Sequence, residues 1–169
     1  MSVPTFSEML ASAAREAIHL EMRDTYTPDD PCYIEWQKTG IADVDAYWHE
    51  WREEVTRAVG RGVAIRRARI VSEPVTDFIR YEYELTSPLN IAAGEQVRWL
   101  PRSRASDLAL PGNNFWVLDE HLVRFGFFGG NGEDVGEELT RDPAQIKLCT
   151  AAFEAVWQRG IDHSEYRPE

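Results

Sequence analysis

The chain of 169 residues carries 18 basic and 29 acidic side chains, a formal net charge of −11, and 43% of its residues are hydrophobic. That apolar content is sufficient for a hydrophobic core, so the composition excludes an intrinsically disordered chain and favours one ordinary domain. An acidic protein repels phosphate groups, so we expect no direct binding to nucleic acid or to an anionic membrane surface.

The negative charge is unevenly distributed along the chain. Residues 1–56 have a net charge of −8, residues 57–104 of +4 and residues 105–169 of −7. A basic central segment therefore lies between two acidic ends. Either the chain's own carboxylates or a partner neutralises this segment, and the sequence leaves both possibilities open.

Cysteine and histidine spacing gives no indication of a bound metal or cofactor. Cys32 and Cys149 are far apart and outside any C-x-x-C or Cys/His pattern, and the four histidines contain no pair at i, i+4. We expect no disulfide framework, metal or cofactor. Residues 1–20 carry charged side chains without an apolar run, so we expect neither a signal peptide nor a membrane span, and a cytoplasmic location.

The first part of the chain is predicted to be helical. Apolar residues recur at steps of three and four over 6–22, and Thr5 with Glu8 forms a capping box, so the pattern predicts a helix there. Two prolines in 24–31 favour a loop. The same apolar spacing predicts a second helix over 43–59.

The second part of the chain is predicted to form a sheet. Segments rich in β-branched and aromatic residues alternate with segments of helical spacing, and turn residues separate them. These elements cover residues 63–71 (strand), 76–85 (helix), 95–100 (strand), 115–118 with 122–128 (hairpin) and 142–157 (helix).

This order of elements favours an α/β fold with a mixed sheet, and α+β is the alternative. Two N-terminal helices precede a central β-α-β unit, a β-hairpin and a C-terminal helix. We expect a single domain over residues 1–169, with a helical part at about 5–60 and a sheet-centred part at about 61–160.

A basic strand is the sharpest local feature. The period of two places Arg67 and Arg69 on one largely apolar face and Arg66 on the other. A buried guanidinium group needs a paired anion. One interpretation is internal pairing, and the other is a pocket for an anionic small molecule or an acidic partner segment. The internal partners would be Glu82, Glu84, Asp119 or Glu120.

The candidate ligand- or partner-binding residues are arginines, tryptophans and turn side chains near this strand. They are Arg67, Arg69, Arg80, Arg98, Trp99, Arg102, Trp116, Asp119 and His121. His121 lies beside carboxylates as a general base would, but no Ser or Cys nucleophile pattern accompanies it, and a solvated hairpin turn is the simpler interpretation. We therefore predict no catalytic residue. Gly129–Gly132 lacks the order of a phosphate-binding loop.

Four blocks of sequence carry a family resemblance. They are HLEMRDTY (19–26), IVSEPVTDFIRYE (70–82), GEQVRWLPR (94–102) and LPGNNFW (110–116), and they resemble an actinobacterial family of single-domain proteins of unknown function. The resemblance implies a gene neighbourhood with helix-turn-helix regulators of the XRE type and small acidic partner proteins. It implies no catalytic residues.

The order strand, helix, strand, hairpin, helix is also similar to one half of a phospholipase D-type fold. Enzymes of that superfamily have a His nucleophile, a Lys two residues later that holds the phosphate, and an Asp further on. The four histidines here are followed two residues later by Glu21, Trp51, Val123 and Glu165. This resemblance therefore implies a fold without the hydrolytic activity.

Two functional hypotheses follow from these patterns. The first is a non-enzymatic regulatory or interaction protein that acts with a DNA-binding helix-turn-helix regulator or a small acidic protein. The alternative is a ligand-binding protein or enzyme whose arginine-lined pocket takes a phosphate- or carboxylate-bearing small molecule.

Overall fold

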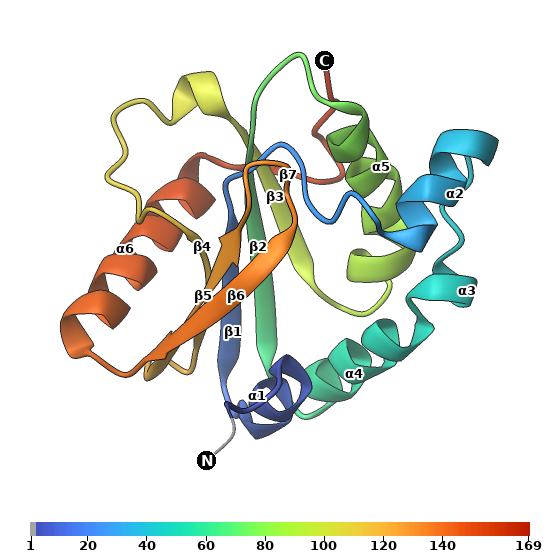
Figure 1. Cartoon of the computed structure of the whole chain (residues 1–169). Coiled ribbons are helices and arrows are strands. Elements are labelled where there is room, and N and C mark those ends of the chain that lie inside the picture. Colours follow the sequence, from blue (N-terminus) through green and yellow to red (C-terminus); the bar gives the residue numbers. More distant parts are fainter. Residues whose placement is uncertain (1–2) are drawn as a thin grey trace.

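The computed structural model describes residues 3–169, so the first two residues of the predicted domain lie outside it. A mixed sheet of seven strands forms the centre, and helices pack against both of its faces (Figure 1). The predicted α/β class with a mixed sheet is confirmed.

The strands are β1 (Glu16–Glu21), β2 (Ala64–Val71), β3 (Gln96–Pro101), β4 (Asn114–Leu118), β5 (Leu122–Phe128), β6 (Asp134–Thr140) and β7 (Ile161–Asp162). Their order in the sheet is β6-β5-β4-β1-β2-β3-β7. β1, β2 and β3 run parallel to one another, and the other neighbouring strands pair antiparallel. β1 is therefore a central strand.

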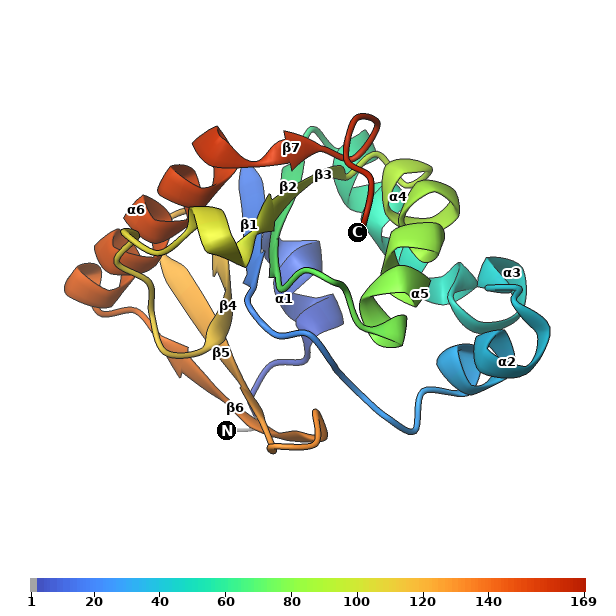
Figure 2. The ribbon, with the colours of Figure 1, turned by 90° about the horizontal axis from the view of Figure 1, so that it is seen from above.

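The helices are α1 (Phe6–Ser12), α2 (Pro31–Thr39), α3 (Val44–Tyr47), α4 (His49–Gly60), α5 (Asp77–Thr86) and α6 (Pro143–Arg159). α6 covers one face of the sheet, where Phe153 packs on Ile18 and Ile70, and α1, α4 and α5 lie on the other side (Figure 2). None of the helices in residues 3–169 is both long enough and apolar enough to cross a membrane.

The predicted helix over 6–22 is wrong. α1 ends at Ser12, and the second half of that segment is the central strand β1. Neighbours on both sides bury β1, so Ala17 on one face and Ile18 on the other are both apolar. A strand buried on both faces loses the alternation that identifies a strand, and its apolar residues here fall at helical spacing by coincidence.

Other differences concern short or exposed elements. The loop predicted over 24–31 is present up to Asp30. α2, which follows it, was not predicted; Pro31 stands at its first helical position behind the capping side chain of Asp30. The helix predicted over 43–59 is two helices separated at Trp48. α5 continues past Pro88 as a π-helical turn. β6 and β7 were not predicted.

The remaining predicted helices and strands are confirmed. β2, β3 and α6 occupy the expected segments, and Asp142 caps α6 ahead of Pro143. β4 and β5 form the predicted hairpin, and Asp119 and Glu120 in its turn both have positive φ, 51° and 56°. That backbone matches the twist of the paired strands.

Candidate functional site

The arginines of β2 are paired inside the protein. Arg67 donates to Glu21 and Glu95, and Arg69 donates to Glu21 at 3.1 Å and to the hydroxyl of Thr86 at 2.7 Å. Both arginines are buried on the sheet face opposite α6. The internal-pairing interpretation therefore describes these two side chains.

The partners differ in part from those expected. Glu82 lies 3.7 Å from Arg69, as predicted. Glu84 instead accepts a hydrogen bond from Trp36, and Asp119 accepts from backbone N–H groups elsewhere. The main partner, Glu21, was missed because the sequence placed it on a helix. Burial alone would raise the pKa of Glu21, but Arg69 and Arg67 hold it well below its ordinary value.

His19 lies beside this ion-pair network on β1. Its Nδ1 is 2.8 Å from the carbonyl oxygen of Phe115, its Nε2 is 3.2 Å from Glu21, and its ring stacks on Trp116 at 4.2 Å. Burial and the charge of Arg67 lower the pKa of His19. These three contacts hold the ring of His19 in place in the floor of the site.

Glu82 is the one member of this group whose carboxylate is poorly satisfied. Its side chain is 13% exposed, and its buried Oε2 has no hydrogen-bond partner among residues 3–169. Burial raises the pKa of Glu82 to about 7, although Arg69 opposes the shift. With Arg67 and Arg69 already matched by Glu21 and Glu95, an ionised Glu82 adds a negative charge that the network does not balance.

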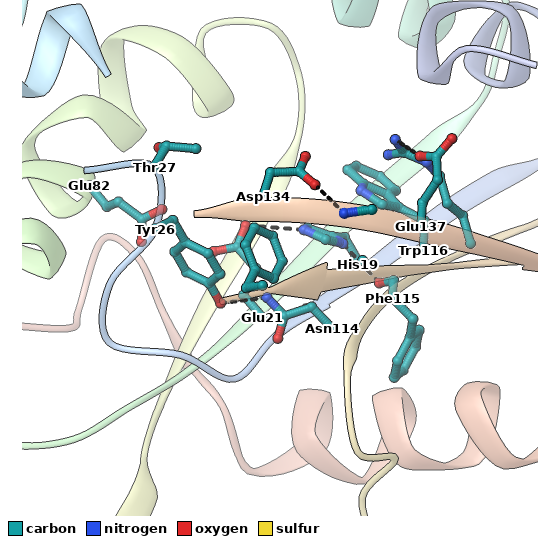
Figure 3. Close-up of a pocket in the computed structure, with 14 residues that line it drawn as sticks. His19, Glu21, Tyr26, Thr27, Glu82, Asn114, Phe115, Trp116, Asp134 and Glu137 are labelled. Carbon is teal, nitrogen blue, oxygen red and sulfur yellow. Dashed lines mark hydrogen bonds and ion pairs between the residues drawn. The ribbon is translucent and has the colours of Figure 1, made fainter. Parts of the chain in front are cut away.

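A cavity of about 260 Å³, called here the His19 cavity, opens above these side chains. His19 and Glu21 form its floor, Trp116 lies at one end, and Tyr26 and Glu82 lie at the other (Figure 3). Further lining comes from Asn114 of β4, Arg124 and Phe128 of β5, and Asp134 and Glu137 of β6.

Hydrogen bonds fix the walls of the His19 cavity. The hydroxyl of Tyr26 accepts from Asn114 and, at 3.0 Å, from the backbone N–H of Arg23. Arg124 and Glu137 form an ion pair at the opposite end. Asp134 accepts only a backbone N–H bond, at 3.0 Å from Gly136, and it is exposed on the rim.

A second cavity of about 150 Å³, the Arg67 cavity, adjoins the first between α5 and the sheet. The two cavities share Tyr26, Thr27 and Glu82 in their linings. Arg67 and Arg69 line this second cavity together with aromatic and aliphatic side chains. Glu82 therefore stands at the boundary between an acidic cavity and one whose arginines are already paired.

Three of the nine residues predicted for the site lie at these cavities: Arg67, Arg69 and Trp116. Trp99 is on the same face but fully buried, and its ring packs 4.8 Å from the guanidinium carbon of Arg69. Arg80 is exposed on α5.

The other four lie elsewhere. Arg98 is on the α6 side of the sheet, where it donates to the carbonyl of Trp157 at 2.8 Å. Arg102 donates to Met22, and Asp119 accepts the N–H groups of residues 14–16. His121 lines a separate hollow beside α6.

Sequence reasoning missed His19, Glu21 and Asp134. The helical spacing of the apolar residues in this segment concealed His19 and Glu21, because β1 is buried on both faces. The exposed strand that carries Asp134 has too few apolar residues to give a strand signal. Within residues 3–169, no three His, Cys, Asp or Glu side chains are grouped so that they could hold a metal ion.

The sequence matches the model of the family DUF6879, described as a domain of unknown function, over residues 4–168. The chain belongs to this family. No curated protein matches the DUF6879 chain.

The DUF6879 chain is similar in structure to Nuc, a phospholipase D family member from Salmonella typhimurium. The TM-score is 0.52 at 14% sequence identity, with 95% of this chain and 88% of Nuc covered. This similarity shows a phospholipase D-like fold and extends no further than the fold. Phosphatidylserine synthase from Haemophilus influenzae Rd KW20 also matches, at a TM-score of 0.45 and 11% identity, over 96% of this chain and 39% of that one.

Proposed function

We propose that this DUF6879 protein is a non-enzymatic interaction protein that acts with a DNA-binding helix-turn-helix regulator. The observation that carries the proposal is the acidic His19 cavity: Glu82 and Asp134 face it, while the arginines beneath it are paired internally. The chain therefore offers negative charge to a partner.

The charge of the whole protein supports the same class of partner. The net charge is −11, and pairing of Arg67 and Arg69 within the chain removes the principal basic feature of the sequence from the surface. A helix-turn-helix regulator carries basic side chains that contact phosphates. Opposite charges on two proteins accelerate their association and favour the correct partner over others.

The chemistry of the cavity supports a role without catalysis. Both ring nitrogens of His19 lie within 3.2 Å of oxygen atoms, and no Ser or Cys of residues 3–169 lines the His19 cavity. Burial raises the pKa of Cys149 to about 11, so this thiol is not an activated nucleophile at neutral pH. In the phospholipase D-like fold, this chain also lacks the His and Lys spacing that the hydrolases of that superfamily use.

A second candidate is an anionic small molecule in the Arg67 cavity. The observation that favours it is that Arg67 and Arg69 both line that cavity. It is the weaker candidate, because Glu95 and Glu21 already pair with Nε and Nη1 of Arg67, and Glu21 also pairs with Nε of Arg69. An anion in this cavity would compete with these buried carboxylates for the two arginines.

Size-exclusion chromatography of the full chain with an XRE-type helix-turn-helix regulator, the partner that the family resemblance implies, tests the proposal. We expect co-elution that weakens as salt is added, because the Debye length falls from about 10 Å at 0.1 M to about 3 Å at 1 M. We also expect that the chain alone does not shift a DNA fragment. Separate elution at low salt, or a DNA shift by the chain alone at moderate salt, would contradict the proposal.

A further inference from the structure

We propose that the His19 cavity binds the guanidinium group of an arginine supplied by the partner, with Glu82 as the carboxylate that accepts its N–H groups. The inference rests on the proposed function for the source of the arginine. It adds the chemistry of the contact and the residue that makes it.

Glu82 supplies the acceptor. Its Oε2 is buried without a hydrogen-bond donor among the described residues, and the nearest cation, Arg69, is 3.7 Å away and directs its Nε and Nη1 to Glu21 and Thr86. Leaving a buried carboxylate oxygen unpaired is costly. The side chain is still 13% exposed and lines the cavity, so a cationic donor that enters there meets the accessible part of a carboxylate that lacks a full set of partners.

Aromatic rings supply the flat surfaces that a guanidinium group stacks on. Tyr26 and Phe128 line the His19 cavity at the end that holds Glu82, and their rings meet edge to face at 5.0 Å. Trp116 lies at the other end, where its ring already stacks on His19. A planar guanidinium group is attracted to such ring faces more readily than a compact ammonium group is.

The same face of the sheet already holds the chain's own guanidinium groups in this way. Arg67 lies 5.4 Å from the ring of Trp116 and 5.6 Å from that of Trp51, while Glu21 and Glu95 accept its N–H groups. Arg69 lies over Trp99 and pairs with Glu21. The His19 cavity offers an aromatic wall and a carboxylate. Arg23 lies 5.8 Å from the ring of Phe128 but donates to the carbonyl of Gly129, and no arginine among residues 3–169 donates a hydrogen bond to Oε2 of Glu82.

Charge and size agree with a single arginine side chain. Arg124 neutralises Glu137 at one end of the cavity, which leaves Glu82 and the rim residue Asp134 to attract a cation. The cavity volume of about 260 Å³ is below the roughly 300 Å³ at which pockets for drug-sized ligands begin. One side chain fits this space better than a large ligand does.

Titration of the isotope-labelled full chain with Nα-acetyl-L-arginine amide, followed by NMR, tests the inference. We expect shifts at the indole N–H of Trp116 and at Tyr26 and Asn114. Nα-acetyl-L-lysine amide should bind more weakly, and the neutral citrulline analogue weakest of all, because the charge and the planar shape both contribute. The titration is run at about pH 8, where Glu82 is ionised.

Glu82→Gln keeps the shape of the side chain and removes its charge. We expect it to weaken binding of the arginine probe by about tenfold or more, the effect of losing one charge-assisted hydrogen bond. Glu138→Gln is the matched control. Glu138 is an exposed residue of β6, and its register partner Phe125 packs on the α6 side, so this change removes a charge away from the cavity. Its affinity should equal that of the unmodified chain.

The inference is overturned if the arginine probe leaves the cavity resonances unchanged, if Glu82→Gln binds it as well as the unmodified chain does, or if the lysine probe binds equally well. Failure of the proposed function gives a different result in the co-elution experiment. If the regulator co-elutes equally with the Glu82→Gln variant, the inference fails and the partnership stands. If the probe binds but no regulator co-elutes, the partner is wrong and the cavity chemistry stands.

Discussion

At the scale of single residues, Glu82 differs from the buried charged groups beside it. Arg67 and Arg69 are matched by Glu21 and Glu95, so Glu82 is the carboxylate in excess. Its pKa is raised to about 7 by burial, while that of Glu21 is held low by the two arginines. The pKa values of two carboxylates in one network are therefore shifted in opposite directions.

This difference predicts how stability depends on pH. Because the pKa of Glu82 is higher in the folded chain than its ordinary 4.5, the folded state holds the proton more tightly, and the free energy of unfolding falls as the pH rises from about 4.5 to 7. Glu82→Gln lacks this effect. Above pH 7 the variant should be the more stable protein by up to about 3 kcal/mol.

Urea unfolding at pH 5 and pH 8 measures the effect. The advantage of Glu82→Gln should grow between the two pH values, whereas Glu138→Gln should follow the unmodified chain at both. The groups that face Glu82 are common to all three proteins, and they include Glu21, Arg67 and Arg69. An advantage that is the same at both pH values would show that Glu82 is ionised throughout.

The residue pattern of the sequence predicted part of this network. The period of two correctly placed Arg67 and Arg69 on one face and Arg66 on the other, where Arg66 pairs with Glu154 of α6. It also named Glu82 as a partner. It could not find Glu21, because pairing between strands distant in sequence is a property of the sheet and is not written in local spacing.

At the scale of elements, Asp119 joins the β4–β5 hairpin to the start of β1. Its carboxylate accepts the backbone N–H groups of Ala14, Arg15 and Glu16 at 2.7–2.9 Å, and its φ of 51° allows the tight turn. These bonds fix β1 beside β4, and β1 carries the floor of the His19 cavity. Asp119 is therefore a positioning residue of the fold, and it lies outside the cavity itself.

Asp119→Ala should destabilise the protein by about 1–3 kcal/mol, because it removes the acceptor of three backbone N–H groups, of which that of Glu16 is partly buried, and places alanine at a positive φ. Asp119→Asn keeps an acceptor oxygen and tolerates the backbone, so it should lose less. The free energy of unfolding from chemical denaturation measures both. An effect of Asp119→Ala no larger than that of His121→Ala, an exposed change in the same turn, would show that the anchor is unimportant.

Elements with strong local signals were predictable and those defined by tertiary context were not. The hairpin and β2 have clear strand sequences, and α6 has helical periodicity and the capping residue Asp142. β1 lacks alternation because it is buried on both faces, and β6 is polar because it lies at the exposed edge of the sheet. The floor and the rim of the His19 cavity come from these two strands, so the site was the least predictable part of the chain.

At the scale of the whole molecule, the fold pairs arginines inside and leaves acidic groups accessible. Buried arginines are neutralised within the sheet face opposite α6, and the acidic groups that remain face outward or into the His19 cavity. The two central arginines of the basic middle segment, Arg67 and Arg69, are therefore not part of a basic surface of the protein. A phospholipase D-like scaffold here presents an acidic, aromatic-walled cavity.

The most direct test of this account is the footprint of the helix-turn-helix regulator on the isotope-labelled chain, mapped by NMR. The account predicts that the largest changes occur at Tyr26, Trp116 and Asp134 around the His19 cavity, and that Glu82→Gln reduces them. Unchanged cavity resonances together with a footprint on the outer surface of α6 would contradict it.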